Sequence, residues 1–153
     1  MKALVIGGGF IGTALVPALQ SRSFEVESTD RSTCLLSNLP DRLPRADVVF
    51  ICAAMSKFIV CEADPLAYRV NVDSPYRIAL LTKPAKVVFL SSEAVEKALH
   101  TNYGMQKALA EQLLLPLGAR IARLSKVIPE RLNSCCHFLI DLAEAPPGIY
   151  HWS

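Results

Sequence analysis

The chain lacks a marked excess of charge of either sign. Its 16 lysines and arginines against 14 acidic residues leave a formal net charge of +2. Such a balance does not favour nucleic acid or a membrane surface as a partner. No apolar run reaches the length that crosses a bilayer, and the first residues do not have the form of a signal peptide. We therefore expect a cytoplasmic protein.

Cysteine is sparse and irregularly spaced. The five thiols do not form a Cys-x-x-Cys pair, so the sequence favours neither a zinc site nor a disulfide framework, and we expect no metal. Cys135, Cys136 and His137 are adjacent, but neighbouring residues on a helix diverge in direction. We interpret them as partly buried packing residues, and all five cysteines as reduced thiols: Cys34, Cys52, Cys61, Cys135 and Cys136.

Apolar residues make up 52% of the 153 positions, which suits one domain with a sizeable core. Short apolar runs alternate with segments of helical periodicity, a pattern typical of a parallel sheet with helical crossovers. We predict an α/β fold with a Rossmann-like doubly wound parallel sheet, strand order 3-2-1-4-5-6, in a single domain over residues 1–153. The predicted strands are 3–6, 24–29, 48–52, 87–90, 119–124 and 149–152. The predicted helices are 11–22, 64–81 with a kink or restart at Ser74–Pro75, 103–115 capped by Asn102, and 134–143.

The first strand is followed directly by a glycine-rich turn, Gly7-Gly-Gly-Phe-Ile-Gly12. Gly7 can form a tight strand-to-helix turn, Gly9 leaves the backbone open to a pyrophosphate, and Gly12 allows close packing of helix on strand. The helix N-terminus, including Phe10 and Ile11, offers unpaired N–H groups to phosphates. The motif predicts dinucleotide binding; the alternative is a tight turn without a ligand.

An acidic residue closes the second predicted strand. Asp30 lies 18 residues after Gly12, near the position where an acid binds the adenosine ribose hydroxyls. Arg31 could instead pair with a 2′-phosphate, which Asp30 would repel. The pair favours NAD, with NADP as the alternative.

Potential reacting groups follow the fourth strand. Ser91 and Ser92 end it, and Tyr103 and Lys107 are spaced to share one face of the next helix. An ammonium and the positive end of a bound nicotinamide, both close to a phenol, favour its ionised form and lower its pKa. Tyr103 could then exchange a proton with a substrate hydroxyl or carbonyl, while a serine hydroxyl binds the same oxygen.

Together these segments resemble the short-chain dehydrogenase/reductase superfamily, in particular its extended branch of NAD(P)-dependent epimerases, dehydratases and nucleotide-sugar reductases. The resemblance follows the family's order along nearly the whole chain. It rests on Gly7–Gly12, Leu15–Leu19, Asp47–Ala54, Asn71-Val72, Val87–Ser92, Tyr103–Lys107 and Arg123-Leu124.

The resemblance implies a role for each matching residue. Tyr103 would be the catalytic acid/base, and Lys107 would lower its pKa and hold the nicotinamide ribose. Ser92 would polarise the reacting oxygen, with Ser91 as the second candidate. Ala53 and Ala54 would line the cofactor cleft.

The chain also departs from the extended branch. The glycine turn is one residue shorter, and the substrate region after the fifth strand is nearly absent, with a remnant at about 126–145. So short a substrate region suggests a small substrate, an open site, or a pocket completed by a second subunit in a homodimer. The Tyr103–Leu115 helix is the expected dimer face, by analogy with single-domain relatives.

The sequence leaves three functional interpretations open. The first is an NAD(P)-dependent oxidoreductase or epimerase acting on a carbonyl or hydroxyl group, with a nucleotide sugar as one candidate substrate. The second is a catalytically inactive NAD(P)-binding regulator or scaffold, which the shortened substrate region favours. The third, an interaction module with a relic site, ranks lowest because the three glycines and Asp30 are intact.

Overall fold

The computed structural model describes residues 1–30, 34 and 36–153, and its centre is a six-stranded parallel sheet. The strands are β1 (Lys2–Ile6), β2 (Glu25–Thr29), β3 (Val48–Ile51), β4 (Lys86–Ser92), β5 (Arg120–Leu124) and β6 (Gly148–Trp152). Their order in the sheet is β2-β1-β3-β4-β5-β6, and every neighbouring pair is parallel. The predicted doubly wound, Rossmann-like class is therefore confirmed.

The chain winds outward from β1 in two directions. β2 lies on one side of β1, and β3 to β6 follow on the other, so the winding reverses between β1 and β3. The predicted order 3-2-1-4-5-6 describes the same arrangement in a different numbering, because the described residues between β2 and β3 add no strand to the sheet. Ligands of such sheets bind where the winding reverses, outside the carboxyl ends of the strands.

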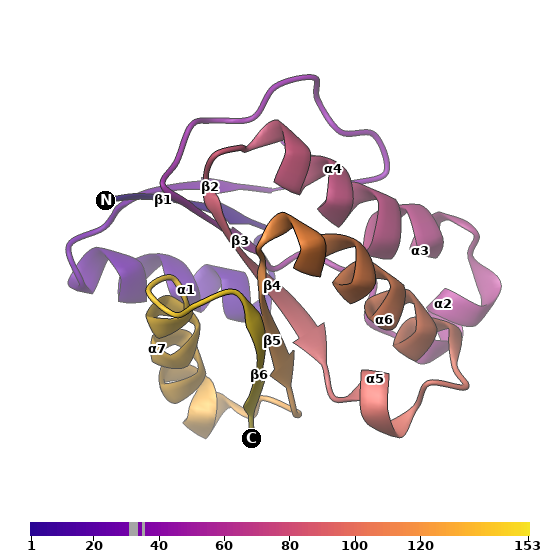
Figure 1. The fold of residues 1–153 in the computed structure, drawn as a ribbon. Helices are drawn as coiled ribbons and strands as arrows, with labels where there is room; N and C mark the ends of the chain where they lie inside the picture. The colour runs from indigo at the N-terminus through magenta and orange to yellow at the C-terminus, as the bar shows by residue number, and fades with distance from the viewer. Residues whose placement is uncertain (31–33, 35) are drawn as a thin grey trace.

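Helices cover both faces of the sheet (Figure 1). α1 (Phe10–Ser21) and α7 (Leu132–Leu142) lie side by side on one face. α4 (Ser74–Leu81) and α6 (Asn102–Leu114) cover the other, together with α2 (Phe58–Ala63) and α3 (Leu66–Tyr68). Shorter elements complete the chain: a π-helix (Arg69–Asp73), α5 (Ala94–Lys97) and the 3₁₀ turns Leu115–Leu117 and Pro129–Arg131.

The core consists of two apolar layers, one on each face of the sheet. Alternate side chains of β1 divide between them: Val5 packs with α1 and α7, whereas Leu4 packs with α4 and α6. All four residues of β3 are buried, as expected of a strand covered on both faces. The predicted strands and the four predicted helices are thus confirmed within a few residues at their ends.

Several local predictions differ from the structure. The cap of α6 is Thr101, whose hydroxyl accepts the Gly104 N–H at 3.1 Å, and Asn102 is the first helical residue. Residues 66–81 include a π-helical segment, Arg69–Asp73, that was not predicted, and α4 starts at Ser74 with Pro75 in its first turn, where a kink or restart was expected. The short helices α2 and α5 were not predicted, because six and four residues are too few to establish a period.

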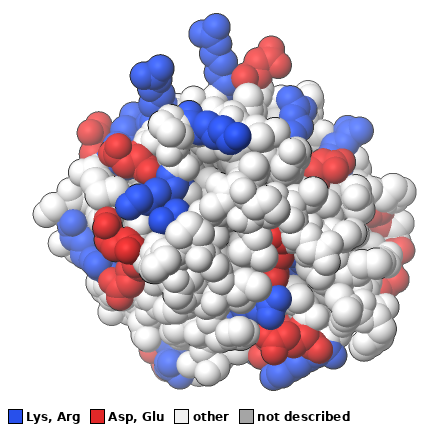
Figure 2. Space-filling view, in the orientation of Figure 1, with Lys and Arg blue, Asp and Glu red and all other residues white. Residues whose placement is uncertain are grey.

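Charged side chains of both signs are intermixed on the face shown in Figure 2, in keeping with the small net charge. Within the described part of the chain, no helix combines the length and the apolar character that crossing a bilayer requires.

Candidate active site

A cleft of about 1520 Å³ opens at the carboxyl ends of the strands. It is larger than the roughly 300–1,000 Å³ of an ordinary small-molecule pocket. Every described site residue predicted from the sequence lines it: Gly7, Gly9, Phe10, Ile11, Gly12, Asp30, Ala53, Ala54, Ser91, Ser92, Tyr103 and Lys107. Arg31, the remaining predicted cofactor residue, lies outside the described residues.

Two glycines of the turn are required by the protein's own packing. Gly7 has a φ of +114°, and a Cβ there would lie 2.8 Å from the Ala53 backbone nitrogen. A Cβ on Gly12 would lie 2.1 Å from the carbonyl oxygen of Gly7. Neither position accepts a side chain without movement of the backbone, which fixes the approach of α1 to β1 and β3.

Gly9 is different, because a Cβ there would meet nothing within 4 Å. It is the N-cap of α1 and has no side chain to bind the first-turn N–H groups. Its missing Cβ therefore leaves open space in front of a helix N-terminus, where N–H groups and the helix dipole favour an anion. This cradle fits the pyrophosphate of a dinucleotide.

Other predicted cofactor residues line the cleft on either side of the glycine turn. Asp30 is exposed and follows β2 directly, on the side of the turn expected for a ribose. Residues Ala53–Ser56 follow β3 and form one wall of the cleft. The Ala53 N–H donates to the Ile6 carbonyl at 3.0 Å, which ties this wall to β1.

The two serines at the end of β4 have different surroundings. The Ser91 hydroxyl is buried and donates to Glu111 Oε2 at 2.5 Å, on the inner side of α6. The Ser92 hydroxyl accepts the Ala94 N–H at 3.0 Å, and its hydrogen bonding to Tyr103 opposes the rise in the tyrosine pKa. Ser92 is therefore the serine that faces the phenol, whereas Ser91 is engaged elsewhere.

Tyr103 stands at the start of α6, and its ring meets that of Phe58 edge-on with centroids 5.3 Å apart. Burial raises its pKa above the ordinary value of 10.0, and the hydrogen bond from Ser92 offsets only part of this effect. The expectation that Lys107 lowers the tyrosine pKa is thus not met in this structure. The Lys107 Nζ lies 5.9 Å from the centre of the ring, and the cost of burial dominates.

Lys107 is buried beneath the cleft. Its Nζ donates to the Leu90 carbonyl at 2.9 Å and lies 4.7 Å from the centre of the Phe89 ring. Burial lowers its pKa from 10.5 to about 8, although the neighbouring charge of Glu111 raises it. A lysine with this pKa changes its charge just above neutrality.

A buried amide network that sequence reasoning did not single out supports the Ala53–Ser56 wall. Asn71 pairs with Met55 as a strand residue would: its Oδ1 accepts the Met55 N–H, and its Nδ2 donates to the Met55 carbonyl, both at 2.9 Å. The same Nδ2 donates to Gln106 Oε1 on α6 at 2.8 Å. The sequence analysis named Asn71 only within the Asn71-Val72 match to the superfamily and assigned it no contact.

Gly104, beside the candidate catalytic tyrosine, was also not singled out. A Cβ at this position would lie 2.2 Å from the Ala98 carbonyl oxygen. The glycine therefore lets the start of α6 pack against the residues after α5, which places Tyr103 next to Ser92.

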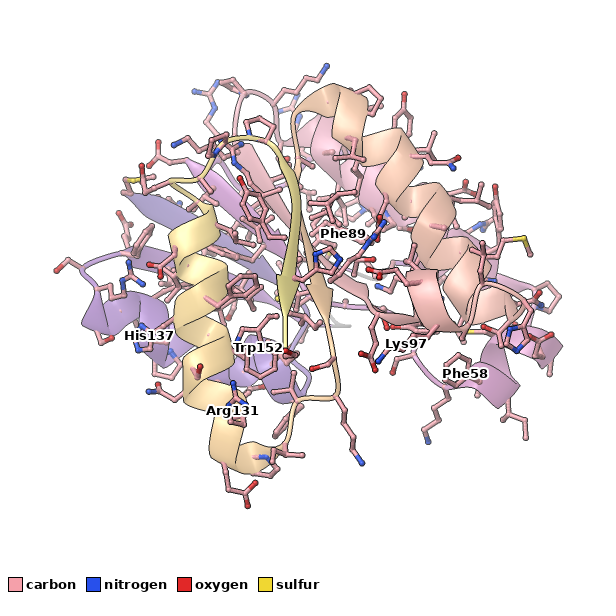
Figure 3. The ribbon with its side chains drawn as sticks, turned by 60° about the horizontal axis from the view of Figure 1, so that its bottom comes forward. Phe58, Phe89, Lys97, Arg131, His137 and Trp152 are labelled. Carbon is pink, nitrogen blue, oxygen red and sulfur yellow. The ribbon has the colours of Figure 1, made fainter. Side chains whose placement is uncertain are left out.

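Figure 3 shows the side of the molecule onto which the strand ends open. Phe58 and Lys97 lie on the α6 side, and Arg131 and Trp152 lie at the start of α7, with the guanidinium 4.9 Å from the ring centre. Lys97 lines the cleft and pairs with Glu93 at 3.0 Å, and the exposed Lys126 lines it after β5.

Residues 3–128 match the model of the NAD dependent epimerase/dehydratase family. The match spans most of the chain, and the protein belongs to this family. A comparison with curated protein sequences gives no match.

The fold is also that of several solved enzymes. A dTDP-4-dehydrorhamnose reductase from Bacillus anthracis in complex with NADP is 20% identical, with a TM-score of 0.83 over 100% of this chain and 75% of that one. The enzyme of the same name from Yersinia enterocolitica is also 20% identical, with a TM-score of 0.83 over 99% of this chain and 74% of that one. The Bordetella bronchiseptica enzyme WbmH in complex with NAD+ is 15% identical, with a TM-score of 0.74 over 100% of this chain and 75% of that one.

Proposed function

We propose that the protein is an NAD(P)-dependent oxidoreductase or epimerase that acts on a carbonyl or hydroxyl group, with Tyr103 as the proton donor and acceptor. The observation that carries the proposal is the meeting of two sets of residues in one cleft. Ser92, Tyr103 and Lys107 share it with the open cradle at Gly9.

Each half of the cleft has a defined role in this proposal. The first turn of α1 and Gly9 would hold the pyrophosphate, Asp30 the adenosine ribose, and Lys107 the nicotinamide ribose. When bound, the cofactor supplies or accepts a hydride.

The protonation state of Tyr103 suits reduction of a carbonyl. Its raised pKa keeps the phenol protonated at neutral pH, which is the form that donates a proton. In the proposed step the substrate oxygen accepts the Tyr103 proton while its carbon receives the hydride, and Ser92 holds that oxygen by a hydrogen bond. Oxidation of a hydroxyl runs the same transfers in reverse.

We further propose a nucleotide sugar as the substrate class. The family name and the two dTDP-sugar reductases with the same fold support this choice. The cleft also extends past the strand ends to Ser125–Val127, so a second molecule can lie beside a dinucleotide.

Substitution of the tyrosine tests the proposal. Tyr103→Phe is expected to abolish turnover and to leave NAD(P)H affinity nearly unchanged, because the hydroxyl serves proton transfer. Tyr68→Phe, at an exposed tyrosine outside the cleft, is the matched control. Thermal shifts with NAD, NADH, NADP and NADPH, alone and with nucleotide sugars, report binding: a ligand at 100 times its dissociation constant stabilises by about 2.7 kcal/mol.

The outcomes separate the remaining interpretations. Binding without turnover in the native protein would favour the inactive NAD(P)-binding regulator or scaffold. No thermal shift with any dinucleotide would overturn the proposal altogether.

A further inference from the structure

A row of three polar residues crosses the sheet next to the candidate active site. Ser91 of β4, Arg123 of β5 and His151 of β6 are direct neighbours in register. Two carboxylates from the covering helices bridge this row. Glu111 of α6 binds Ser91 and Arg123, and Glu96 of α5 binds Arg123 and His151.

The two bridges differ sharply in exposure. The Glu111 side chain is 3% exposed and accepts from the Arg123 Nη2 at 2.7 Å and from its Nε at 3.1 Å. The Glu96 side chain is 50% exposed and accepts from the Arg123 Nη1 at 3.1 Å. A buried carboxylate that accepts two hydrogen bonds from one guanidinium is held firmly, whereas an exposed ion pair is screened by water and salt. Of the two bridging carboxylates, Glu111 is therefore the one that fixes α6 to the sheet.

Glu111 and Lys107 lie one helical turn apart and dock on consecutive residues of β4. Lys107 donates to the Leu90 carbonyl at 2.9 Å, and Glu111 accepts from the Ser91 hydroxyl. The next residue of the strand is Ser92, which faces Tyr103. The register between α6 and β4, on which the Ser92–Tyr103 arrangement depends, is thus set by these two side chains.

Glu111 is also the anion that acts on Lys107. Among the described residues, the other titratable groups near the ammonium are Tyr103 on the same helix, Cys61 of α2 and Cys52 after β3. Burial raises the pKa of each of these three groups, so all are neutral near pH 7. The charge that faces Glu111 from β5 is Arg123, and Glu111 lies between the two cations.

We propose that Glu111 is a positioning residue of the candidate active site. It docks the helix that carries Tyr103 and Lys107 onto β4 and β5, and its negative charge keeps Lys107 protonated at neutral pH. The catalytic part of this assignment rests on the proposed function, but the effect on the charge of Lys107 does not.

Glu111→Gln tests the charge while retaining a side chain of the same shape. The readout is the titration of the Lys107 side chain, followed by NMR in the intact folded protein, with its signal assigned by Lys107→Arg. The midpoint is expected to fall by about one pH unit or more when the nearby carboxylate is removed. Glu96→Gln is the matched control, since it removes a carboxylate from the same arginine at an exposed position, and it is expected to leave the midpoint unchanged.

A second variant keeps the proposal testable if Glu111→Gln fails to fold. Glu111→Asp retains the charge but withdraws the carboxylate from Ser91, so the midpoint should stay near its native value while thermal stability falls. A midpoint for Glu111→Gln within about 0.3 pH units of the native value, or an equal fall in Glu96→Gln, would overturn the proposal.

Turnover gives an independent readout. In Glu111→Gln the loss of kcat at pH 8 should be partly recovered at pH 6, where Lys107 is protonated again; a purely structural defect would not recover. If the native protein shows no turnover, the proposed function fails, but the Lys107 titration still decides the charge assignment.

Discussion

The two halves of the cleft are held in place by opposite means. At the glycine turn, the structure depends on side chains that are absent: Cβ atoms on Gly7 and Gly12 would collide with backbone. At the other half, Tyr103 and Lys107 lie on a helix fixed by polar side chains that are present and buried, among them Glu111. The first half should lose stability when an atom is added, whereas the second should lose activity, and change its stability in either direction, when a charge or a hydrogen bond is changed.

The largest expected effect comes from adding atoms at Gly12. Gly12→Val should reduce the free energy of unfolding by about 2–4 kcal/mol, because its Cβ would lie 2.1 Å from a backbone oxygen that cannot rotate away. Urea denaturation measures the loss. A variant as stable as the native protein would show that the turn is not fixed by close packing.

Substitution of Lys107 is expected to change the free energy of unfolding by a smaller amount and in the opposite direction. Its native pKa of about 8 lies below the ordinary 10.5, so the folded state binds the proton less tightly than the unfolded chain. Burial of the charge therefore destabilises the protein fully below pH 8, and the penalty declines as the pH rises to 10.5. Lys107→Met should thus stabilise the fold by roughly 1–3 kcal/mol at pH 7, a gain that is reduced because the Leu90 carbonyl loses its donor. The gain should be smaller at pH 10, where the native lysine is already neutral.

Denaturation of Lys107→Met at pH 7 and pH 10 checks this expectation, with the exposed Lys57→Met as control. Cofactor-dependent activity should be lost in the same variant. A destabilised Lys107→Met at pH 7 would mean that the hydrogen bond to Leu90 outweighs the cost of burying the charge.

The contrast between the halves also explains what the sequence could predict. The strands, the main helices and the glycine turn follow from patterns among near neighbours, such as the spacing from Gly7 to Gly12. The supports of Tyr103 and Lys107 join residues far apart in the chain: Asn71 with Gln106, and Ser91 with Glu111. No local pattern pairs such residues, so the candidate catalytic groups were predicted but not the network that holds them.

The raised pKa of Tyr103 was missed for a related reason. The spacing of Tyr103 and Lys107 places them on one helix face, which suggested that the ammonium would lower the phenol pKa. Spacing says nothing about depth, and both groups are buried enough for desolvation to dominate. The cap at Thr101 differs by a single residue from the predicted Asn102, which is the usual uncertainty of a helix end.

The smallest expected effect on stability separates binding from folding at the glycine turn. Gly9 has an extended backbone that any residue can adopt, and a Cβ there meets nothing within 4 Å. Gly9→Ala should therefore change the free energy of unfolding by less than about 0.5 kcal/mol. Its methyl group would, however, occupy the space where a pyrophosphate approaches the α1 N-terminus, so NADH affinity should fall about tenfold or more, which corresponds to roughly 1.4 kcal/mol.

Thermal unfolding with and without NADH measures both quantities, and Gly8→Ala, whose Cβ would lie 4.0 Å from that of Asp30, is the neighbouring control. Unchanged affinity in Gly9→Ala would mean that this glycine serves only the turn, and the distinction between the two halves would then hold for folding but not for binding.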